Sequence, residues 1–353
     1  MQKLLIFLSL FSIAHSYYLD RLSNLQNKYL VGKNSRVFFI SAEQQKVLDT
    51  VQLVTQNGND NSNGTYLSIT TPTGSLTPMT PSQDNDTLLV FVPANLTGFL
   101  YITEDPNINV YPLSQNSSAI NFQPGTNVFF NLKLPPLGSV QQIPIANNVV
   151  INAAVSFRGL AGVPEQIGMV FFDAANFSGL TNYNSLQLAS EVFHFQTNGV
   201  DVQYEISYGY RVGILVNDAG LLMTRDFPNA DDPMVTSSVR DYEIGNFNGD
   251  NITLYLMCRF NPTFFYTTNI TLYNLDKTLQ TSFVLNSTTD TFIKLASVFE
   301  RLTIEGAAPY SIQYQVFDPY ATTVKYETST KSGSFVDFFV SLSLVVLAGI
   351  LNF

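Results

Sequence analysis

The chain has 353 residues, of which 45% are hydrophobic, 13% aromatic and only 12% charged, and its formal net charge is −10. This composition excludes a disordered protein, because disordered chains are rich in charge and poor in apolar residues. The acidic balance speaks against nucleic-acid binding, since an acidic surface repels phosphate groups. The length is sufficient for two or three domains.

The first 16 residues have the layout of a cleaved secretory signal. Lys3 precedes an apolar core from Leu4 to Ala14, and small residues stand at the end of the segment. One positive charge, a short apolar core and a small-residue cleavage site are typical of signal peptides. We therefore expect residues 1–16 to be removed and the mature protein to begin at Tyr17.

Beyond the signal, the chain has almost no helical periodicity and many short runs rich in Val, Ile, Phe, Tyr and Thr. Clusters of Asn, Gly, Asp and Pro separate these runs, and apolar and polar residues alternate clearly in Val202–Tyr208 (VQYEISY). This pattern indicates antiparallel strands with one buried face, and closely spaced strands favour sandwiches or barrels. We therefore predict an all-β fold of tandem antiparallel β-sandwich modules.

A weak repeat divides the predicted strands into three groups. A Gly-x-Asn turn precedes an aromatic-rich strand three times: SRVFFI after Gly32, VFFNLKL after Gly125 and ITLYLM after Gly249. Further strands and polar loops follow each of them in the same order, which is how repeated modules are recognised. Gly-x-Asn is also common by chance in an Asn-rich chain, so two larger β domains are the alternative. The repeat predicts modules at residues 19–113, 114–216 and 217–320.

Asn-x-Ser/Thr sequons, the acceptor sites of N-glycans, are frequent in this chain. Several would occur by chance in a sequence so rich in Asn, Ser and Thr. Together with the secretory signal, they predict a glycoprotein that carries glycans at several of these sites. The sequons are Asn63, Asn85, Asn95, Asn116, Asn176, Asn251, Asn269 and Asn286.

The apolar run that ends the sequence, Phe338–Phe353, is shorter than the about 20 residues of a spanning helix. A glycosylphosphatidylinositol (GPI) anchor signal has small residues at the attachment site and an apolar tail of about 10–20 residues. Ser332-Gly333-Ser334 supplies the small residues, and residues 335–353 form the hydrophobic tail. We therefore expect a GPI anchor at Ser332, within a Ser/Thr stalk and anchor site at residues 321–334. Attachment at Ser329 and a short single-pass membrane helix are the alternatives.

Residues that could carry catalysis are scarce. Without the signal the chain has one histidine, His194, and one cysteine, Cys258, which disfavours a zinc site with several such ligands or a Ser-His-Asp triad. No P-loop, dinucleotide fingerprint or nucleophile elbow is present. We interpret His194 as a surface or rim residue, because it points away from Phe193 and Phe195. We interpret Cys258 as a small buried apolar residue, with a reactive thiol or an intermolecular bridge as the alternative. The prediction is a protein without catalysis and without a cofactor.

Carboxylate chemistry stays open as a rival, because a secreted glycoside hydrolase needs only two acids at a defined separation. The densest acidic region lies between Arg225 and Pro233. Its Asp226, Asp231 and Asp232 are weak calcium candidates, since calcium takes several oxygen ligands from one loop. A solvated loop whose Asp side chains make turn hydrogen bonds is the favoured interpretation, so no metal site is predicted.

Two stretches, Val92–Ile102 (VPANLTGFLYI) and Val192–Tyr208 (VFHFQTNGVDVQYEISY), resemble the late strand, exposed turn and final strand of CUB domains. With the signal and the apolar tail, the chain resembles the nematode secreted CUB-like family over its full length. CUB modules usually carry cysteine pairs, which this chain lacks. The resemblance implies stacked β-sandwiches and a cell-surface or secreted protein connected with responses to microbes, without established catalysis.

The prediction is thus a glycosylated recognition or barrier protein at the extracellular face of the plasma membrane, or secreted. Its partners would be the membrane, through the lipid anchor, and a protein or carbohydrate ligand, but not nucleic acid. A structural component of a surface coat is a further alternative. Rigid sandwiches commonly bind through their loops, and the candidate contact loops are residues 57–64, 172–183 and 227–235.

Overall fold

The computed structural model describes the greater part of the chain from Tyr17 to Pro319. The described residues are 17–25, 28–57, 65–66, 76–81, 86–113, 125–132, 143–151, 156–177, 180, 182–197, 202–209, 213–224, 227–228, 238–246, 249–260, 267–274, 276–285, 291–306 and 309–319. The predicted signal, anchor site and hydrophobic tail lie outside them. Within these ranges, no helix has the length and apolar character that a membrane span requires.

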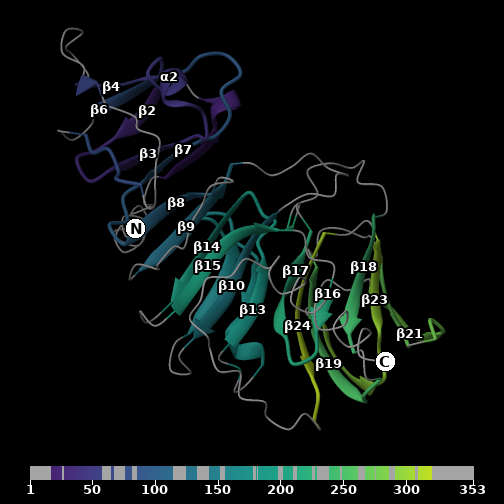
Figure 1. Cartoon of the computed structure of the whole chain (residues 1–353). Coiled ribbons are helices and arrows are strands. Elements are labelled where there is room, and N and C mark those ends of the chain that lie inside the picture. The colour runs from purple at the N-terminus through teal and green to yellow at the C-terminus, as the bar shows by residue number, and fades with distance from the viewer. Residues whose placement is uncertain are drawn as a thin grey trace, which may run out of the picture. The chain divides into compact units, whose positions relative to one another are not determined.

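The described chain folds almost entirely into β-strands (Figure 1), which confirms the predicted all-β class. Its helical elements in these ranges are one short α-helix and two turns of 3-10 helix. They are α2 (Gln45–Leu48), η1 (Leu22–Asn24) and η2 (Ala174–Asn176).

The described strands form five sheets, here called sheets I to V. Sheet I has the order β2 (Lys28–Val31), β6 (Asp86–Phe91), β4 (Gln52–Asn57) and β5 (Thr65–Tyr66). Sheet II consists of β1 (Tyr18–Arg21), β7 (Phe99–Thr103) and β3 (Arg36–Ile40). Sheet III has the order β12 (Val170–Asp173), β11 (Phe157–Ala161), β14 (Val192–Thr197), β9 (Thr126–Asn131) and β8 (Ile108–Leu113).

The two remaining sheets come from the second half of the chain and one earlier strand. Sheet IV has the order β15 (Val202–Gly209), β10 (Ile143–Ile151), β13 (Asn182–Gln187), β17 (Ala219–Met223), β24 (Tyr310–Phe317), β19 (Ile252–Phe260) and β22 (Thr291–Ser297). Sheet V has the order β16 (Gly213–Leu215), β18 (Ser238–Gly245), β23 (Arg301–Gly306), β20 (Thr268–Tyr273) and β21 (Leu279–Leu285). Pairing is antiparallel except between β8 and β9, β13 and β17, and β16 and β18.

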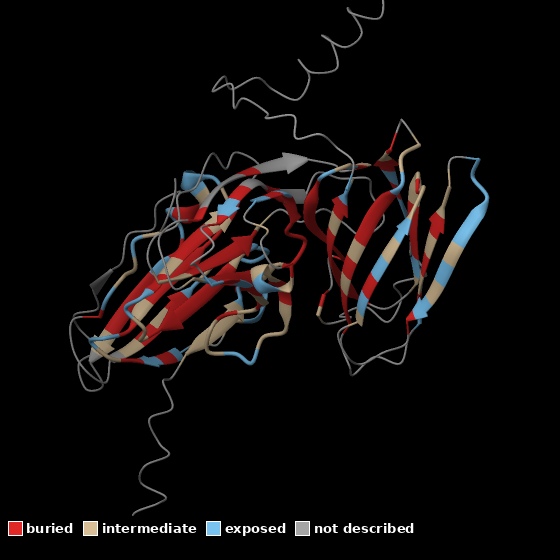
Figure 2. Cartoon of the chain, turned by 90° about the horizontal axis from the view of Figure 1, so that it is seen from below, coloured by how far each residue is buried: buried red, intermediate tan, exposed pale blue. Residues whose placement is uncertain are grey.

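Four clusters of buried side chains lie between successive sheets, so sheets II, III and IV bury both of their faces. Strands of such sheets are expected to be continuously apolar. In a sheet with one solvent-exposed face, apolar and polar residues alternate along each strand. Every residue of β7 (FLYIT) and of β17 (AGLLM) is buried. In the outer sheets, β2 and β20 alternate between buried and more exposed residues. Figure 2 shows both patterns: some strands are red (buried) over most of their length, and in others red alternates with tan or pale blue (intermediate or exposed).

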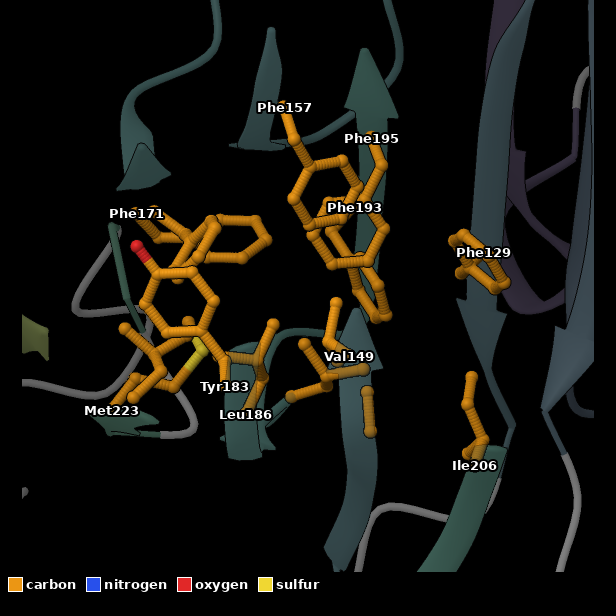
Figure 3. Close-up of a cluster of buried hydrophobic side chains, with 14 of the residues drawn as sticks. Phe129, Val149, Phe157, Phe171, Tyr183, Leu186, Phe193, Phe195, Ile206 and Met223 are labelled. Atoms are coloured by element: carbon orange, nitrogen blue, oxygen red, sulfur yellow. The ribbon is translucent and has the colours of Figure 1, made fainter. Parts of the chain in front are cut away.

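Aromatic rings dominate the cluster between sheets III and IV (Figure 3). Phe129 stacks on Phe193 with 5.2 Å between ring centroids, and Phe157 stacks on Phe195 at 4.8 Å. Stacked and edge-on aromatic pairs each contribute about 0.5–1.5 kcal/mol beyond their buried area. Burial of this kind stabilises the fold in a chain whose single cysteine cannot form an internal disulfide.

Sheet IV continues across the predicted boundary between residues 216 and 217. Strand β13 pairs in parallel with β17, and Ser185 lies opposite Gly220. A Cβ atom at Gly220 would lie 2.1 Å from the carbonyl oxygen of Ser185, so only glycine allows this approach. The second and third predicted modules therefore share one continuous sheet, although the cores on its two faces are separate.

Candidate functional site

A cleft of about 210 Å³ lies where strands from sheets II and III meet. It is smaller than the pockets of about 300–1,000 Å³ that take drug-sized ligands, so it suits a small molecule or one unit of a larger one. Its walls come from the end of β1, from η1, from the turn before β7, from the end of β9 and from the residue that precedes β14. The lining residues are Arg21, Ser23, Leu96, Thr97, Gly98, Phe99, Asn131, Leu132 and Glu191.

An ion pair between Arg21 and Glu191 forms one wall of the cleft. Arg21 Nη1 donates to Glu191 Oε1 at 3.0 Å, and Nη2 pairs with Oε2. This bidentate geometry fixes the orientation of both side chains better than a single contact would. The Arg21 guanidinium also lies over the Phe99 ring, 5.6 Å from its centroid. Because the two charges neutralise each other, the cleft carries no formal net charge.

Asn131 lines the cleft with an unsatisfied acceptor. The residue is 3% exposed, and its Nδ2 donates to the carbonyl oxygen of Leu188 at 3.3 Å. Its Oδ1 is buried without a hydrogen-bond partner among the described residues. A buried polar atom left unpaired costs about 1–3 kcal/mol, and such atoms in native proteins commonly bind water or a ligand. Asn131 thus brings to the lining of the cleft a side chain whose acceptor has no hydrogen-bond partner among the described residues.

The turn before β7 depends on glycine. Gly98 has φ +138°, and a Cβ atom there would lie 2.0 Å from the carbonyl oxygen of Ile40. The Gly98 carbonyl accepts from the backbone of Leu22 at 3.0 Å, which ties the turn to η1. Leu96 and Thr97 are held at the cleft in this way. The exposed sequon residue Asn95 immediately precedes them, so a glycan there would begin close to the cleft.

The predicted sites fall partly within the described chain. Asn95 and Asn251 are exposed, and Asn176 and Asn269 are partly exposed. The other predicted sites lie outside the described residues: the sequons Asn63, Asn85, Asn116 and Asn286, the anchor residue Ser332, and the calcium candidates Asp226, Asp231 and Asp232. Within the part of the chain that is described, no three His, Cys, Asp or Glu side chains are grouped closely enough to hold a metal ion.

The prediction that residues 172–183 form an exposed contact loop is wrong for the aromatic residues of this segment. Phe172, Phe177 and Tyr183 are buried in the core between sheets III and IV. The Asn176 side chain also turns inward, since its Nδ2 donates to Gln313 Oε1 at 3.1 Å. Gln313 is itself fully buried, so this hydrogen bond connects the segment that follows β12 to sheet IV. The loops at 57–64 and 227–235 lie almost wholly outside the described residues.

The prediction that His194 is a surface residue is also wrong, because its side chain is 1% exposed. It does face away from Phe193 and Phe195, but that face of sheet III packs against sheet II. His194 Nδ1 lies 2.8 Å from the carbonyl oxygen of Gly162. Burial lowers the pKa of the imidazole, which favours the neutral ring, against the opposing effect of the Gly162 hydrogen bond.

Cys258 is fully buried between sheets IV and V, which confirms its interpretation as a small apolar core residue. Burial raises the pKa of its thiol to about 12. The thiolate is the reactive form of cysteine, so this thiol is unreactive in the folded protein.

Sequence reasoning did not identify Arg21, Asn131 or Glu191. Arg21 and Glu191 are separated by 170 positions in the chain, and none of the three stands in a recognisable motif. A shared site becomes visible only when the sheet order places β1, the end of β9 and the residue before β14 at one cleft.

Comparison with known proteins gives no family for this chain. No family model and no curated protein matches it. Among solved structures, the infectious bursal disease virus VP2 subviral particle covers 83% of this chain and 73% of its own, with 8% identity and a TM-score of 0.17. The structure of the Gx strain of the same virus covers 85% and 74%, with 9% identity and a TM-score of 0.16. Likenesses this weak carry no argument about fold or function.

Proposed function

We propose that this chain is a glycosylated recognition protein without catalytic activity, held by a GPI anchor at the extracellular face of the plasma membrane. The signal layout, the sequons and the apolar tail support the location. The observation that carries the recognition role is a cleft lined by Asn131, whose buried Oδ1 has no hydrogen-bond partner among the described residues. A preformed concave site with a few fixed polar groups is the usual form of a small-ligand site.

The ligand class that fits this cleft best is a sugar residue, free or at the end of a polysaccharide. Asn131 Oδ1 requires a donor, which a sugar hydroxyl provides. Ser23 and Thr97 add hydroxyl groups, while Leu96 and Leu132 offer apolar contact to the C–H groups of a sugar ring. The paired charges of the walls favour a neutral ligand over an ionic one. Sugars of a microbial surface agree with what the CUB-like resemblance implies.

Anchoring is tested by expressing the full chain in cultured animal cells and treating the intact cells with phosphatidylinositol-specific phospholipase. The expected result is release of the protein into the medium. Retention on the cells after treatment would contradict the lipid anchor and favour a membrane helix. This result is independent of what the cleft binds.

Recognition is tested by incubating the released protein with an array of neutral and charged glycans. Because Asn95 lies close to the cleft, the array is probed before and after enzymatic removal of the N-glycans. The expected result is selective binding of neutral glycans without their cleavage. Cleavage of a bound glycan would replace the proposal with a hydrolase, and the absence of binding in both forms would contradict the sugar ligand.

A further inference from the structure

Strand β21 is a long sheet edge without the usual protection. It forms one border of sheet V, has seven residues (LQTSFVL), and contains no charged residue and no proline. Its Leu279 and Val284 are 62% and 64% exposed. A neutral, exposed edge of this kind presents unpaired backbone groups to other chains and is prone to strand-to-strand association.

The other edge strands in the described chain have features that disfavour pairing with another chain. The two longest contain a charge: Glu205 in β15 and Lys294 in β22. Strand β8 contains Pro112, which lacks a backbone donor. The remaining edge strands have five residues or fewer. Short length, charge and proline are the devices that natural sheets use against edge pairing, and β21 alone among these borders has none of them.

A predicted glycosylation site lies on the strand that pairs with this edge strand. Asn269 on β20 lies directly opposite Val284 of β21 in the antiparallel register. Its neighbours Thr268 and Ile270 are buried, so Asn269 and the sequon residue Thr271 belong to the outer face of sheet V. Thr271 Oγ1 lies 3.3 Å from Ser282 Oγ on β21.

We propose that an N-glycan at Asn269 protects the β21 edge and keeps the protein monomeric. Neighbouring strands lie about 4.7–4.9 Å apart, and a glycan several sugar rings long therefore reaches from Asn269 across β21 to its free border. A glycan is bulky and solubilising, so it takes the place of the missing lysine or proline. It also covers the exposed Val284 side chain.

This inference rests on the secretory part of the proposed function and is independent of the cleft. Arg21, Asn131 and Glu191 belong to sheets II and III and their adjoining turns, whereas β21 belongs to sheet V. Loss of edge protection would leave the glycan array result unchanged for the monomeric protein.

The test compares the full chain with its Asn269→Gln variant, both produced in cultured animal cells and released by phospholipase or collected from the medium. Peptide mass spectrometry establishes whether Asn269 carries a glycan in the unsubstituted protein. Analytical ultracentrifugation over a range of concentrations then measures the assembly state. The expected result is a monomer for the glycosylated protein and concentration-dependent assemblies for the variant.

Two further variants separate edge protection from a general effect of glycans or from misfolding. Asn251→Gln removes an exposed sequon elsewhere and should leave the monomer unchanged. Adding Val284→Lys to the Asn269→Gln variant places a charge on the edge strand and should restore the monomer. An unglycosylated Asn269, a monomeric Asn269→Gln variant, or assemblies that persist with Val284→Lys would each overturn the proposal.

Discussion

Nδ1 of His194 lies 2.8 Å from the carbonyl oxygen of Gly162, on the face of sheet III that packs against sheet II. A carbonyl oxygen only accepts hydrogen bonds, so the proton of the neutral ring resides on Nδ1. Nε2 is left as an acceptor, 3.5 Å from the side-chain nitrogen of Gln196. The imidazole is therefore a neutral structural element of the core.

The buried neutral histidine predicts a loss of stability in mild acid. Burial holds the folded-state pKa of His194 below the ordinary value of 6.5, so the unfolded chain binds the proton more readily. The contribution of His194 is fully present above pH 6.5 and declines as the pH falls toward the folded-state pKa, by at most about 1.4 kcal/mol per pH unit. Chemical unfolding at several pH values between 7.5 and 5 measures the effect.

The control for this prediction is His194→Asn, whose side-chain amide can still donate toward Gly162 but does not titrate. The variant should lose the part of the pH dependence that begins near pH 6.5. Equal pH dependence in both proteins would assign the acid sensitivity to other groups.

The approach of β13 to β17 predicts a strong effect of Gly220→Ala. The added Cβ atom would lie 2.1 Å from the Ser185 carbonyl oxygen and 2.6 Å from the hydroxyl of Tyr314. Overpacking of this kind costs about 1–3 kcal/mol, so thermal unfolding should begin several degrees lower. Gly213→Ala is the matched control, because its nearest neighbour would be 3.5 Å away. A Gly220→Ala variant as stable as Gly213→Ala would show that the two strands do not pair as described.

The buried thiol predicts protection from alkylation. Cys258 has no exposed surface, and its thiol pKa of about 12 keeps the thiolate scarce at neutral pH. Iodoacetamide should leave the native protein unmodified and label the single cysteine fully in guanidinium chloride. Mass spectrometry gives the labelled fraction, and rapid labelling of the native protein would contradict the packing between sheets IV and V.

Strand periodicity was sufficient to predict the all-β fold class, but not how many faces of each sheet are exposed to solvent. The alternation in β20 correctly indicates a sheet with one exposed face, and the runs of β7 and β17 are apolar because both of their faces are covered. His194 was assigned to the surface by the one-face rule, which fails in an inner sheet. A single sequence contains no direct signal for how many sheets are stacked, so this error has a physical origin.

The cleft could not be predicted from the sequence, for a related reason. Asn131 ends strand β9 and Glu191 immediately precedes strand β14, with nothing local to link either to Arg21 near the N-terminus. Long-range strand order creates the site. The sequons are the opposite case, because a local motif identifies them. The structure adds which of the described ones are exposed and that Asn269 lies opposite the edge strand β21.

The most direct test of the recognition role is the affinity of the Asn131→Leu variant for the glycan that the unsubstituted protein selects. Leucine keeps a similar volume but removes the acceptor Oδ1, so binding should weaken by about tenfold or more, as expected for a lost hydrogen bond to a buried partner. Ser282→Ala, which removes an exposed hydroxyl far from the cleft residues in the sheet order, should bind as the unsubstituted protein does. Isothermal titration calorimetry on the three proteins decides the matter: selective loss in Asn131→Leu is the predicted result, and unchanged affinity in a folded Asn131→Leu variant would contradict the cleft as the binding site.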